Sequence, residues 1–346
     1  MNFGSDNASG VHPRIMAALA AANDGIAASY GRDALTAQAQ DRVREVFDAP
    51  EAAVFLLGTG TGANALALAQ LCLPWGRIFC HETAHIETSE SGAPAWMAGG
   101  AQLALVGGDW GRMTPEALAA RIADYPQEDE HDGLNAVLSV TNATEWGTVH
   151  GPAAVSALAR VARETGMAVH MDGARLGNAL AATGAAPADM TWRAGVDAIS
   201  LGGTKNGCLA LEAVVFFDPD RARDFAFRRM RAGHLWSKHR FLAAQMLALV
   251  EGGLWLDLAR HANGMAARLG QGIVAAGGAL VVPVEANEVF ARIPAEAHAH
   301  LRAHGVIYHL WQDAPPADGA PVTIRLVTSW ATHEDDVGRV LALLQG

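Results

Sequence analysis

Short apolar runs rich in β-branched residues recur along the first two thirds of the chain and alternate with segments of helical spacing. Continuous apolar runs of this length are typical of strands that are covered on both faces. Two of the helical segments, at 115–125 and 152–165, begin with a proline near the first turn. The expected strands lie at 53–57, 77–80, 103–106, 136–140, 167–171, 198–201 and 213–217. This alternation predicts an α/β fold with one mostly parallel seven-stranded sheet.

The pattern changes after Phe217, where a long helical region extends from Asp220 to about Gly278. Shorter strands and a final helix follow, at 279–282, 288–293, 322–327 and 333–344. Two consecutive glycines, Gly252 and Gly253, interrupt the helical pattern and mark the expected boundary. We therefore expect a large domain over residues 1–252 and a smaller C-terminal α+β domain over residues 253–346. The most obvious loop is 312–321.

The composition is that of a globular protein, since 51% of the 346 residues are hydrophobic and can form a sizeable core. The first residues lack the basic start and apolar stretch of a secretory signal, and no stretch reaches ~18 uninterrupted apolar residues. Three cysteines without a CxxC pair suit a reducing compartment. The formal charge of −11 disfavours nucleic acid and anionic membranes. We expect a soluble, cytoplasmic protein that binds a small molecule.

A glycine-rich segment, GTGTGAN at 58–64, follows the first expected strand and opens a helix. At such a helix start, backbone N–H groups and the hydroxyls of Thr59 and Thr61 can bind a phosphate. The segment also fits the pattern G-x-G-x-x-A, and Glu82 lies far enough downstream to bind a ribose, so a Rossmann dinucleotide site stays open. A tight turn without a ligand is the third interpretation.

Residues 81–85 match the zinc-protease pattern H-E-x-x-H, which requires a helix that presents both histidines to one metal ion. Pro74 and Gly76 lie just upstream, and 77–80 is predicted to be a strand, so little room remains for that helix. We therefore expect no metal site. In a loop after a strand, His85 can instead lie flat against an aromatic cofactor ring. A plain surface histidine is the alternative.

Two charged residues follow the fifth and sixth strands, at the edge where open α/β sheets bind ligands. Asp172 lies in HMDGAR (170–175), and a buried aspartate needs a positive partner. That partner is either the protonated pyridine nitrogen of a cofactor or simply Arg175. Lys205 lies among small residues in GGTKNG (202–207), which suits a Schiff-base lysine, with an exposed loop lysine as the alternative.

The positions of these four features along the chain indicate that they belong to one ligand site. An anion site after the first strand, a histidine after the second, an aspartate after the fifth and a lysine after the sixth all fall at one edge of a parallel sheet. An NAD enzyme leaves Asp172 and Lys205 without a role, and a zinc protease leaves three of the four features unexplained. The combination favours an enzyme that uses pyridoxal 5'-phosphate (PLP) and holds it through Lys205.

With these residues in hand, the chain resembles the low-specificity L-threonine aldolase and phenylserine aldolase family of fold-type-I PLP enzymes, which is close to the β-eliminating lyases. The resemblance covers nearly the whole chain and is carried by 4–7 (GSDN), 30–33 (YGRD), 59–64 (TGTGAN), His85, 170–175 (HMDGAR), 204–207 (TKNG) and 324–329 (IRLVTS). It implies retro-aldol cleavage of L-3-hydroxy-α-amino acids to glycine and an aldehyde. It also implies a homodimer or homotetramer with shared active sites.

The resemblance implies roles residue by residue. Lys205 would form the Schiff base, Asp172 would pair with the pyridine nitrogen, and His85 would stack on the ring and could act as a base. His131 is a candidate for contacting the substrate hydroxyl. The remaining implied roles are phosphate binding by Thr59, Gly60 and Thr61, contacts beside the cofactor by Asn142 and Arg175, and substrate-carboxylate binding by Ser5, Arg175 and Arg325.

The chain also departs from the family pattern. Where many members have Glu-Asn-Thr after the fourth strand, it has TNATEW at 141–146, so we expect different hydrogen bonding there. His131 lies in an acidic stretch that would equally suit a solvated loop. A phosphate contact from a neighbouring subunit, by Lys238 or Arg231, cannot be aligned. Two other functions stay open, a PLP-dependent β-eliminating lyase and, more distantly, an NAD-dependent oxidoreductase.

Overall fold

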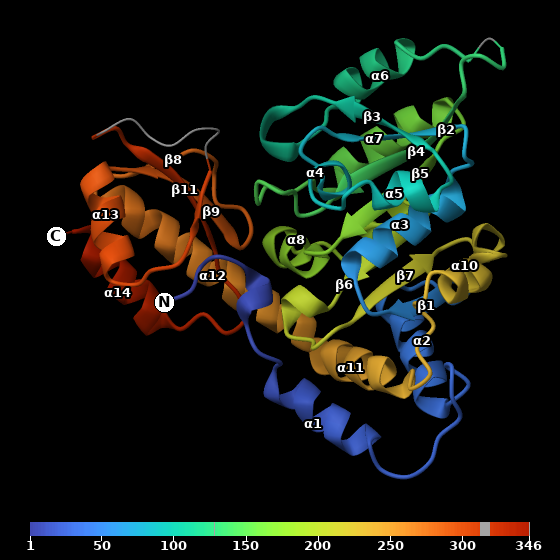
Figure 1. Ribbon diagram of the computed structural model, residues 1–346, viewed down its shortest axis with the longest axis horizontal. Coiled ribbons are helices and arrows are strands. Elements are labelled where there is room, and N and C mark those ends of the chain that lie inside the picture. The colour runs from blue at the N-terminus through green and yellow to red at the C-terminus, as the bar shows by residue number, and fades with distance from the viewer. Residues whose placement is uncertain (128, 312–318, 346) are drawn as a thin grey trace.

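The computed structural model of the chain describes residues 1–127, 129–311 and 319–345. Figure 1 shows a large domain with a central sheet and, beside it, a small domain that contains most of the C-terminal residues, drawn in orange and red. The large sheet has the strand order β1-β7-β6-β5-β4-β2-β3. Its strands are β1 Ala53–Leu57, β2 Gly76–His81, β3 Gln102–Val106, β4 Leu134–Thr141, β5 Ala168–Gly173, β6 Ala198–Gly202 and β7 Glu212–Phe216.

This sheet confirms the predicted mostly parallel α/β architecture. Every neighbouring pair is parallel except the two pairs of β7, which runs antiparallel to β1 and β6. All residues of β5 and β7 are buried, as the continuous apolar runs predicted. The helices are α1 Pro13–Ala22, α2 Ala34–Val46, α3 Gly60–Leu71, α4 His85–Thr88, α5 Ala93–Met97, α6 Pro115–Ala123, α7 Pro152–Glu164, α8 Leu176–Thr183, α9 Pro187–Met190, α10 Phe225–Arg231, α11 Arg240–Val250, α12 Leu254–Ala275, α13 Ala295–Ala303 and α14 Glu334–Leu344.

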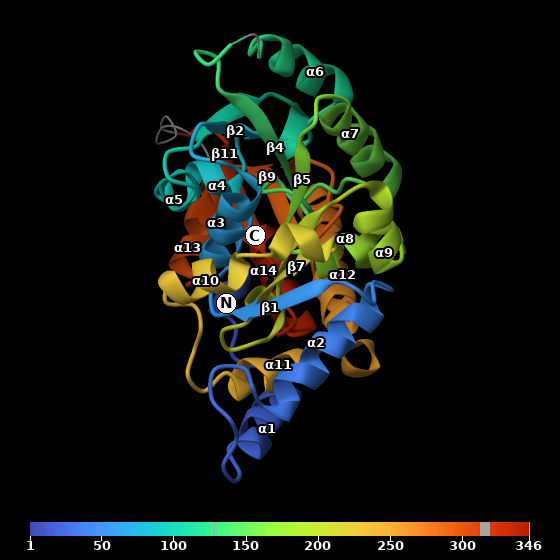
Figure 2. The same cartoon turned by 90° about the vertical axis from the view of Figure 1, so that its right-hand side faces the viewer.

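Helices cover both faces of the large sheet (Figure 2). On one face, Val214 and Phe216 of β7 pack in a cluster with residues of α3 and α10. On the other face, Val215 of β7 belongs to the main core together with Val155 and Leu158 of α7. Alternate residues of one strand therefore enter two different cores, and this explains why Ala213–Phe216, the part of β7 after Glu212, is apolar on both faces.

The direction of the strands gathers the predicted site at one edge. Because β1, β2, β4, β5 and β6 run the same way, their carboxyl ends lie together. The opposite direction of β7 places its first residue, Glu212, at this same edge, where it pairs with Leu57 and Gly202. The segments that follow these strands thus converge on one region of the protein.

The small domain contains a four-stranded antiparallel sheet with the order β10-β11-β9-β8. Its strands are β8 Ala279–Leu280, β9 Glu288–Ile293, β10 His309–Leu310 and β11 Val322–Val327. The predicted strands appear as β8, β9 and β11, and α14 is the predicted final helix. Helix α13 and the short strand β10 had not been predicted. Of the predicted loop 312–321, residues 312–318 lie outside the described residues.

The long helical region predicted after Asp220 is divided into α10, α11 and α12. Helix α12 crosses the predicted boundary: Leu254 and Leu258 pack in the core of the large domain, whereas Leu269 and Ile273 pack in that of the small domain. Phe3 also packs in the core of the small domain. The change of core therefore falls inside α12, and the N-terminal residues join the small domain, in contrast to a simple division at 252.

The same helices account for the most apolar stretch of the protein. By length and composition alone, the helical run Arg240–Ala275 would suffice to cross a membrane. However, 61% of its most apolar 18-residue stretch is buried inside the protein. It is therefore explained as a set of core helices.

The close approach of backbone segments at the site edge can be tested by substitution. A Cβ added to Gly202 would lie 2.7 Å from Ala174 Cα, whereas one added to the exposed Gly264 of α12 meets nothing within 4 Å. We expect Gly202→Ala to lower the free energy of unfolding by about 1–3 kcal/mol through overpacking. Gly264→Ala, by contrast, should raise it by about 0.5–1 kcal/mol because alanine favours a helix. Urea denaturation of both variants measures the difference, and equal midpoints would contradict this account.

Candidate functional site

A pocket opens at the carboxyl edge of the large sheet and brings together residues that follow β1, β2, β4, β5 and β6. It contains six of the residues predicted from the sequence, together with several that had not been assigned a role. The lining residues are Gly60, Thr61, Asn64, His85, Glu90, Thr141, Ala143, Glu145, Asp172, Ala174, Arg175 and Lys205.

The start of α3 forms one end of this pocket. Thr59 caps the helix, because its Oγ1 accepts a hydrogen bond from the N–H of Gly62 at 3.1 Å. The N–H groups of Gly60 and Thr61 belong to the first turn and have no partner within the helix. A Cβ on Gly60 would meet nothing within 4 Å, so the space in front of this helix start is open. These features fit an anion such as a phosphate.

Asp172 is the next-to-last residue of β5 and is 3% exposed. Its Oδ2 accepts a hydrogen bond from Asn64 Nδ2 at 2.9 Å, and its Oδ1 accepts one from the N–H of Ala174 at 3.0 Å. Neither donor carries a charge. The alternative of an Asp172–Arg175 ion pair is wrong, because the Arg175 guanidinium binds Asp6 instead. A buried carboxylate with only neutral donors fits a cationic ring nitrogen.

His85 begins α4, and its ring is held by Glu90. The His85 Nδ1 lies 2.8 Å from Glu90 Oε1, which also accepts a hydrogen bond from Asn64 Nδ2 at 2.9 Å. The Glu90 side chain is fully buried, and burial raises its pKa. Asn64 therefore links Asp172 and Glu90, so that one chain of hydrogen bonds extends from the end of β5 to the ring of His85. Sequence reasoning missed Glu90 and the bridging role of Asn64.

Lys205 lies in a short 3₁₀ turn, Thr204–Asn206, directly after β6. Among the described residues its ammonium group has no hydrogen bond or ion pair within 4 Å, so the amine is available to a ligand. Burial raises the pKa of the neighbouring Glu212 to about 7, although a hydrogen bond from Thr204 and the charge of Lys205 act in the opposite direction. A buried carboxyl thus lies within electrostatic range of the amine.

The two arginines expected to bind a carboxylate are both paired with buried acids. Arg175 Nε lies 2.7 Å from Asp6 Oδ2, and its Nη2 lies 3.7 Å from Glu288 Oε1. Arg325 donates from Nε and Nη2 to the same oxygen of Glu288. Burial raises the pKa of Asp6, but the charges of Arg175 and Lys205 outweigh it, and the pKa stays below its usual value. Glu288 therefore connects the two arginines.

Glu145 lies in the turn after β4 and faces the pocket. Its Oε1 accepts a hydrogen bond from the backbone N–H of His85 at 2.7 Å. Burial, and secondarily the charge of Asp172, raise the pKa of Glu145 to about 7. The sequence showed an unusual segment at 141–146, and this departure from the family pattern was the only signal for the residue.

Three predicted residues lie elsewhere. Asn142 is fully buried and does not line the pocket, because its amide oxygen accepts from the N–H of His150 and its amide nitrogen donates to the His150 carbonyl. The amide of Asn142 is thus already paired inside the protein, and its contact with the cofactor ring stays a prediction. Ser5 caps the turn Asp6–Ala8, beside Asp6, through a hydrogen bond from the Asn7 N–H.

His131 lies on an exposed loop that precedes β4, so it lies at the amino edge of the sheet, away from the pocket. Its ring contacts Asp129, with 3.0 Å between His131 Nδ1 and Asp129 Oδ1. This chain's own pocket does not include it. A contact between His131 and substrate requires a second copy of the chain, and the role stays a prediction.

The H-E-x-x-H segment does not form one helix. His81 ends β2, where its Nδ1 lies 2.9 Å from Thr83 Oγ1 and its Nε2 lies 3.0 Å from the Gly108 carbonyl oxygen. His85 begins a separate short helix. In the part of the chain that the structure describes, no three His, Cys, Asp or Glu side chains gather as metal ligands would. The zinc interpretation therefore has no geometric support.

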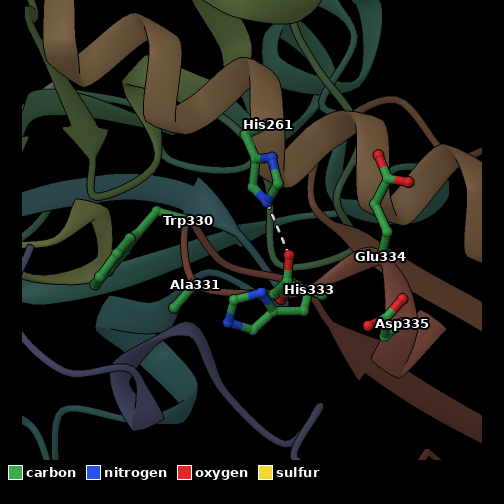
Figure 3. A pocket seen from close by; sticks show the side chains of 7 residues that line it. His261, Trp330, Ala331, His333, Glu334 and Asp335 are labelled. Atoms are coloured by element: carbon green, nitrogen blue, oxygen red, sulfur yellow. Dashed lines mark hydrogen bonds between the residues drawn. The ribbon is translucent and has the colours of Figure 1, made fainter.

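A second hollow, of about 440 Å³, lies between α12 and the start of α14 (Figure 3). His261 Nε2 lies 2.8 Å from the carbonyl oxygen of Thr332 there. Glu334 and Asp335 belong to the first turn of α14, where acidic side chains stabilise a helix, and Glu334 is paired with Arg268. None of the predicted site residues lines this hollow, and we assign it no role in catalysis.

The raised pKa of Glu212 predicts a pH-dependent stability. Because the folded protein keeps this carboxyl protonated up to about pH 7, against 4.5 for the free group, its contribution to stability falls as the pH rises between these values. We expect the free energy of unfolding of wild-type apoprotein to fall by up to about 3 kcal/mol between about pH 5 and about pH 8 because of this carboxyl. In Glu212→Gln this part of the fall should be absent. Urea denaturation at both pH values measures this. The exposed Glu116→Gln serves as the control, and a wild-type-like pH dependence of Glu212→Gln would refute the assignment.

Comparisons with known proteins agree with this geometry. A model of the β-eliminating lyase family matches residues 2–296. The low-specificity L-threonine aldolase of Pseudomonas aeruginosa is 41% identical over 342 residues, which are 99% of this chain and 95% of that protein. The enzyme of the same description from Pseudomonas sp. strain NCIMB 10558 is 39% identical, over 98% of this chain and 96% of that protein. The structure of Leishmania major threonine aldolase superimposes with a TM-score of 0.93 at 27% identity, covering 99% of this chain and 98% of that one. The chain therefore belongs to the β-eliminating lyase family and, within it, to the low-specificity L-threonine aldolases.

Proposed function

We propose that the protein is a PLP-dependent aldolase that cleaves L-3-hydroxy-α-amino acids, such as L-threonine, to glycine and an aldehyde. The observation that carries this proposal is one pocket at the carboxyl edge of one sheet. It holds the buried carboxylate of Asp172 and the amine of Lys205, which has no hydrogen-bond partner among the described residues. The full-length similarity to low-specificity L-threonine aldolases supports it.

The residues of the pocket fit the parts of the cofactor. Gly60 and Thr61 would bind the phosphate at the start of α3, Lys205 would hold the cofactor covalently, and Asp172 would keep its ring nitrogen protonated. His85 would stack on the ring, in an orientation maintained by Glu90. When bound, PLP accepts the electron pair of the bond that breaks at Cα.

The substrate carboxylate would bind at the paired arginines. A guanidinium is planar and donates two parallel hydrogen bonds, which suits a carboxylate. Arg175 lines the pocket, and Arg325 shares with it the partner Glu288. By fixing the carboxylate, these residues orient the bond between Cα and Cβ for cleavage.

We expect purified protein with PLP to release glycine and acetaldehyde from L-threonine. Lys205→Ala should abolish this turnover and also the covalent attachment of cofactor, which borohydride reduction and peptide mass analysis detect in the wild type at Lys205. Release of pyruvate and ammonia from an amino acid, without glycine and aldehyde, would favour the β-eliminating reaction that the family match also allows. A wild-type protein that carries no reducible cofactor would overturn the proposal.

The finer substrate range is also a proposal. We propose that L-allo-threonine and L-phenylserine are cleaved as well, because the side-chain end of the substrate needs only the β-hydroxyl for the reaction and the described relatives have low specificity. A panel of the three amino acids, followed by release of acetaldehyde or benzaldehyde, measures the preference.

We propose further that the enzyme is cytoplasmic and assembles as a homodimer or homotetramer. Large apolar side chains support the assembly: Trp96 and Phe227 are each 76% exposed and line one surface hollow together with Arg231. Such a patch on a single chain is typical of a contact with another chain. Light scattering of the purified protein measures the mass.

A further inference from the structure

Two carboxyl groups of the pocket have an oxygen that is buried and without a hydrogen-bond partner among the described residues, namely Glu90 Oε2 and Glu145 Oε2. An unpaired buried carboxyl oxygen is costly, so a structure that keeps one at a ligand site usually does so for function. The two residues differ in access. The Glu90 side chain is fully buried behind His85 and already accepts two hydrogen bonds, whereas Glu145 is only partly buried.

We propose that Glu145 is the base that removes the proton from the β-hydroxyl of the substrate during retro-aldol cleavage, an inference that rests on the proposed function. Its Oε1 is held by the backbone N–H of His85, which leaves the buried Oε2 without a hydrogen-bond partner among the described residues and able to accept a proton. The residue follows β4, next to the β5 edge that carries Asp172, and lines the pocket together with Lys205.

The proton and electron balance of the step is simple. The hydroxyl proton passes to Glu145 Oε2, the bond between Cα and Cβ breaks, and the hydroxyl oxygen becomes the carbonyl oxygen of the aldehyde. The electron pair of the broken bond stays with the glycine part, where the cofactor accepts it until a proton returns to Cα. The proton on Glu145 then leaves to water, and Cα takes up a proton without the help of Glu145.

The charges around Glu145 suit this task. Burial, and secondarily the charge of Asp172, disfavour its ionised form, whereas the charge of Arg175 attracts it. His85, Glu90 and Lys205 are the other titratable groups that line the same pocket. A carboxyl whose pKa is about 7 can both accept and release a proton near neutral pH, as general base catalysis requires.

This assignment separates the roles of two neighbouring residues. The ring of His85 is fixed through Nδ1 by Glu90 and is suited to stacking, while its backbone N–H positions the base. His85 thus becomes the residue that orients both the cofactor ring and Glu145.

The test replaces the carboxyl by an amide of the same shape. Glu145→Gln should lower kcat for L-threonine by about 100-fold or more, the usual contribution of a general base. In the wild type, kcat should rise with pH through about 7 as Glu145 ionises, and this rise should be absent from Glu145→Gln. Glu145→Asp keeps a carboxyl and should retain the rise at an intermediate rate. Glu116→Gln, an exposed change on α6, is the matched control for loss of one charge.

Two further measurements do not depend on turnover of the amino acid. Infrared difference spectra compare the wild type with Glu145→Asp and with Glu145→Gln. The wild type should show the band of a protonated carboxyl that disappears as the pH rises through about 7, and this band should be missing from Glu145→Gln. Exchange of the glycine α-proton with solvent deuterium, which involves no hydroxyl, should persist in Glu145→Gln.

The outcomes distinguish a failure of the Glu145 assignment from a failure of the proposed aldolase function. If wild-type enzyme releases glycine and aldehyde but Glu145→Gln is as active as wild type or keeps its pH dependence, Glu145 is not the base. Loss of glycine exchange in parallel with aldol cleavage would also overturn the assignment, because it would indicate a general disruption of the pocket. If the wild-type enzyme itself releases no aldehyde, the proposed function fails first.

Discussion

The buried carboxylate of Asp172 is the group around which the pocket is organised. It lies at the end of a central strand, and its two hydrogen-bond donors within the described part of the chain, the Asn64 amide and the Ala174 N–H, are both neutral. A charge in such a place is stable only when a cation completes the site. The same Asn64 amide also holds Glu90, and Glu90 holds His85. The side chains of Asn64 and Glu90 therefore link Asp172, which needs a positive partner, to the His85 ring that would cover the cofactor.

A second set of charges joins the two domains. Asp6, Arg175, Glu288 and Arg325 alternate in sign, and they come from the N-terminal segment, the large domain and two strands of the small domain. Because each is largely buried, removal of one member leaves an unpaired charge on its neighbour. The proposed binding of the substrate carboxylate at Arg175 and Arg325 would thus depend on both domains together. This arrangement explains why the relevant sequence signals lie far apart in the chain.

Sequence reasoning succeeded where one local pattern determines one local structure. Apolar runs predicted all seven strands of the large sheet, and the positions of Asp172 and Lys205 directly after strands predicted that they would share an edge. It failed where the outcome depends on tertiary contacts. The antiparallel direction of β7 leaves no trace in a strand buried on both faces, and β10, with two residues, is too short to have a period. The sequence around Asn142 could not show that His150 binds both ends of its amide. The Asp6–Arg175 pair spans 169 positions, and Glu90 contacts Asn64 across 26.

The position of Phe3 has a mechanical consequence. Its side chain is 1% exposed in the core of the small domain, its N–H donates to the Ile307 carbonyl oxygen, and its carbonyl accepts from the N–H of Val327. Only three residues later, Asp6 holds the guanidinium of Arg175. Three residues of extended chain span at most about 11 Å, so this connection has little slack. A rotation of the small domain would therefore pull on Asp6 and, through their ion pair, on Arg175.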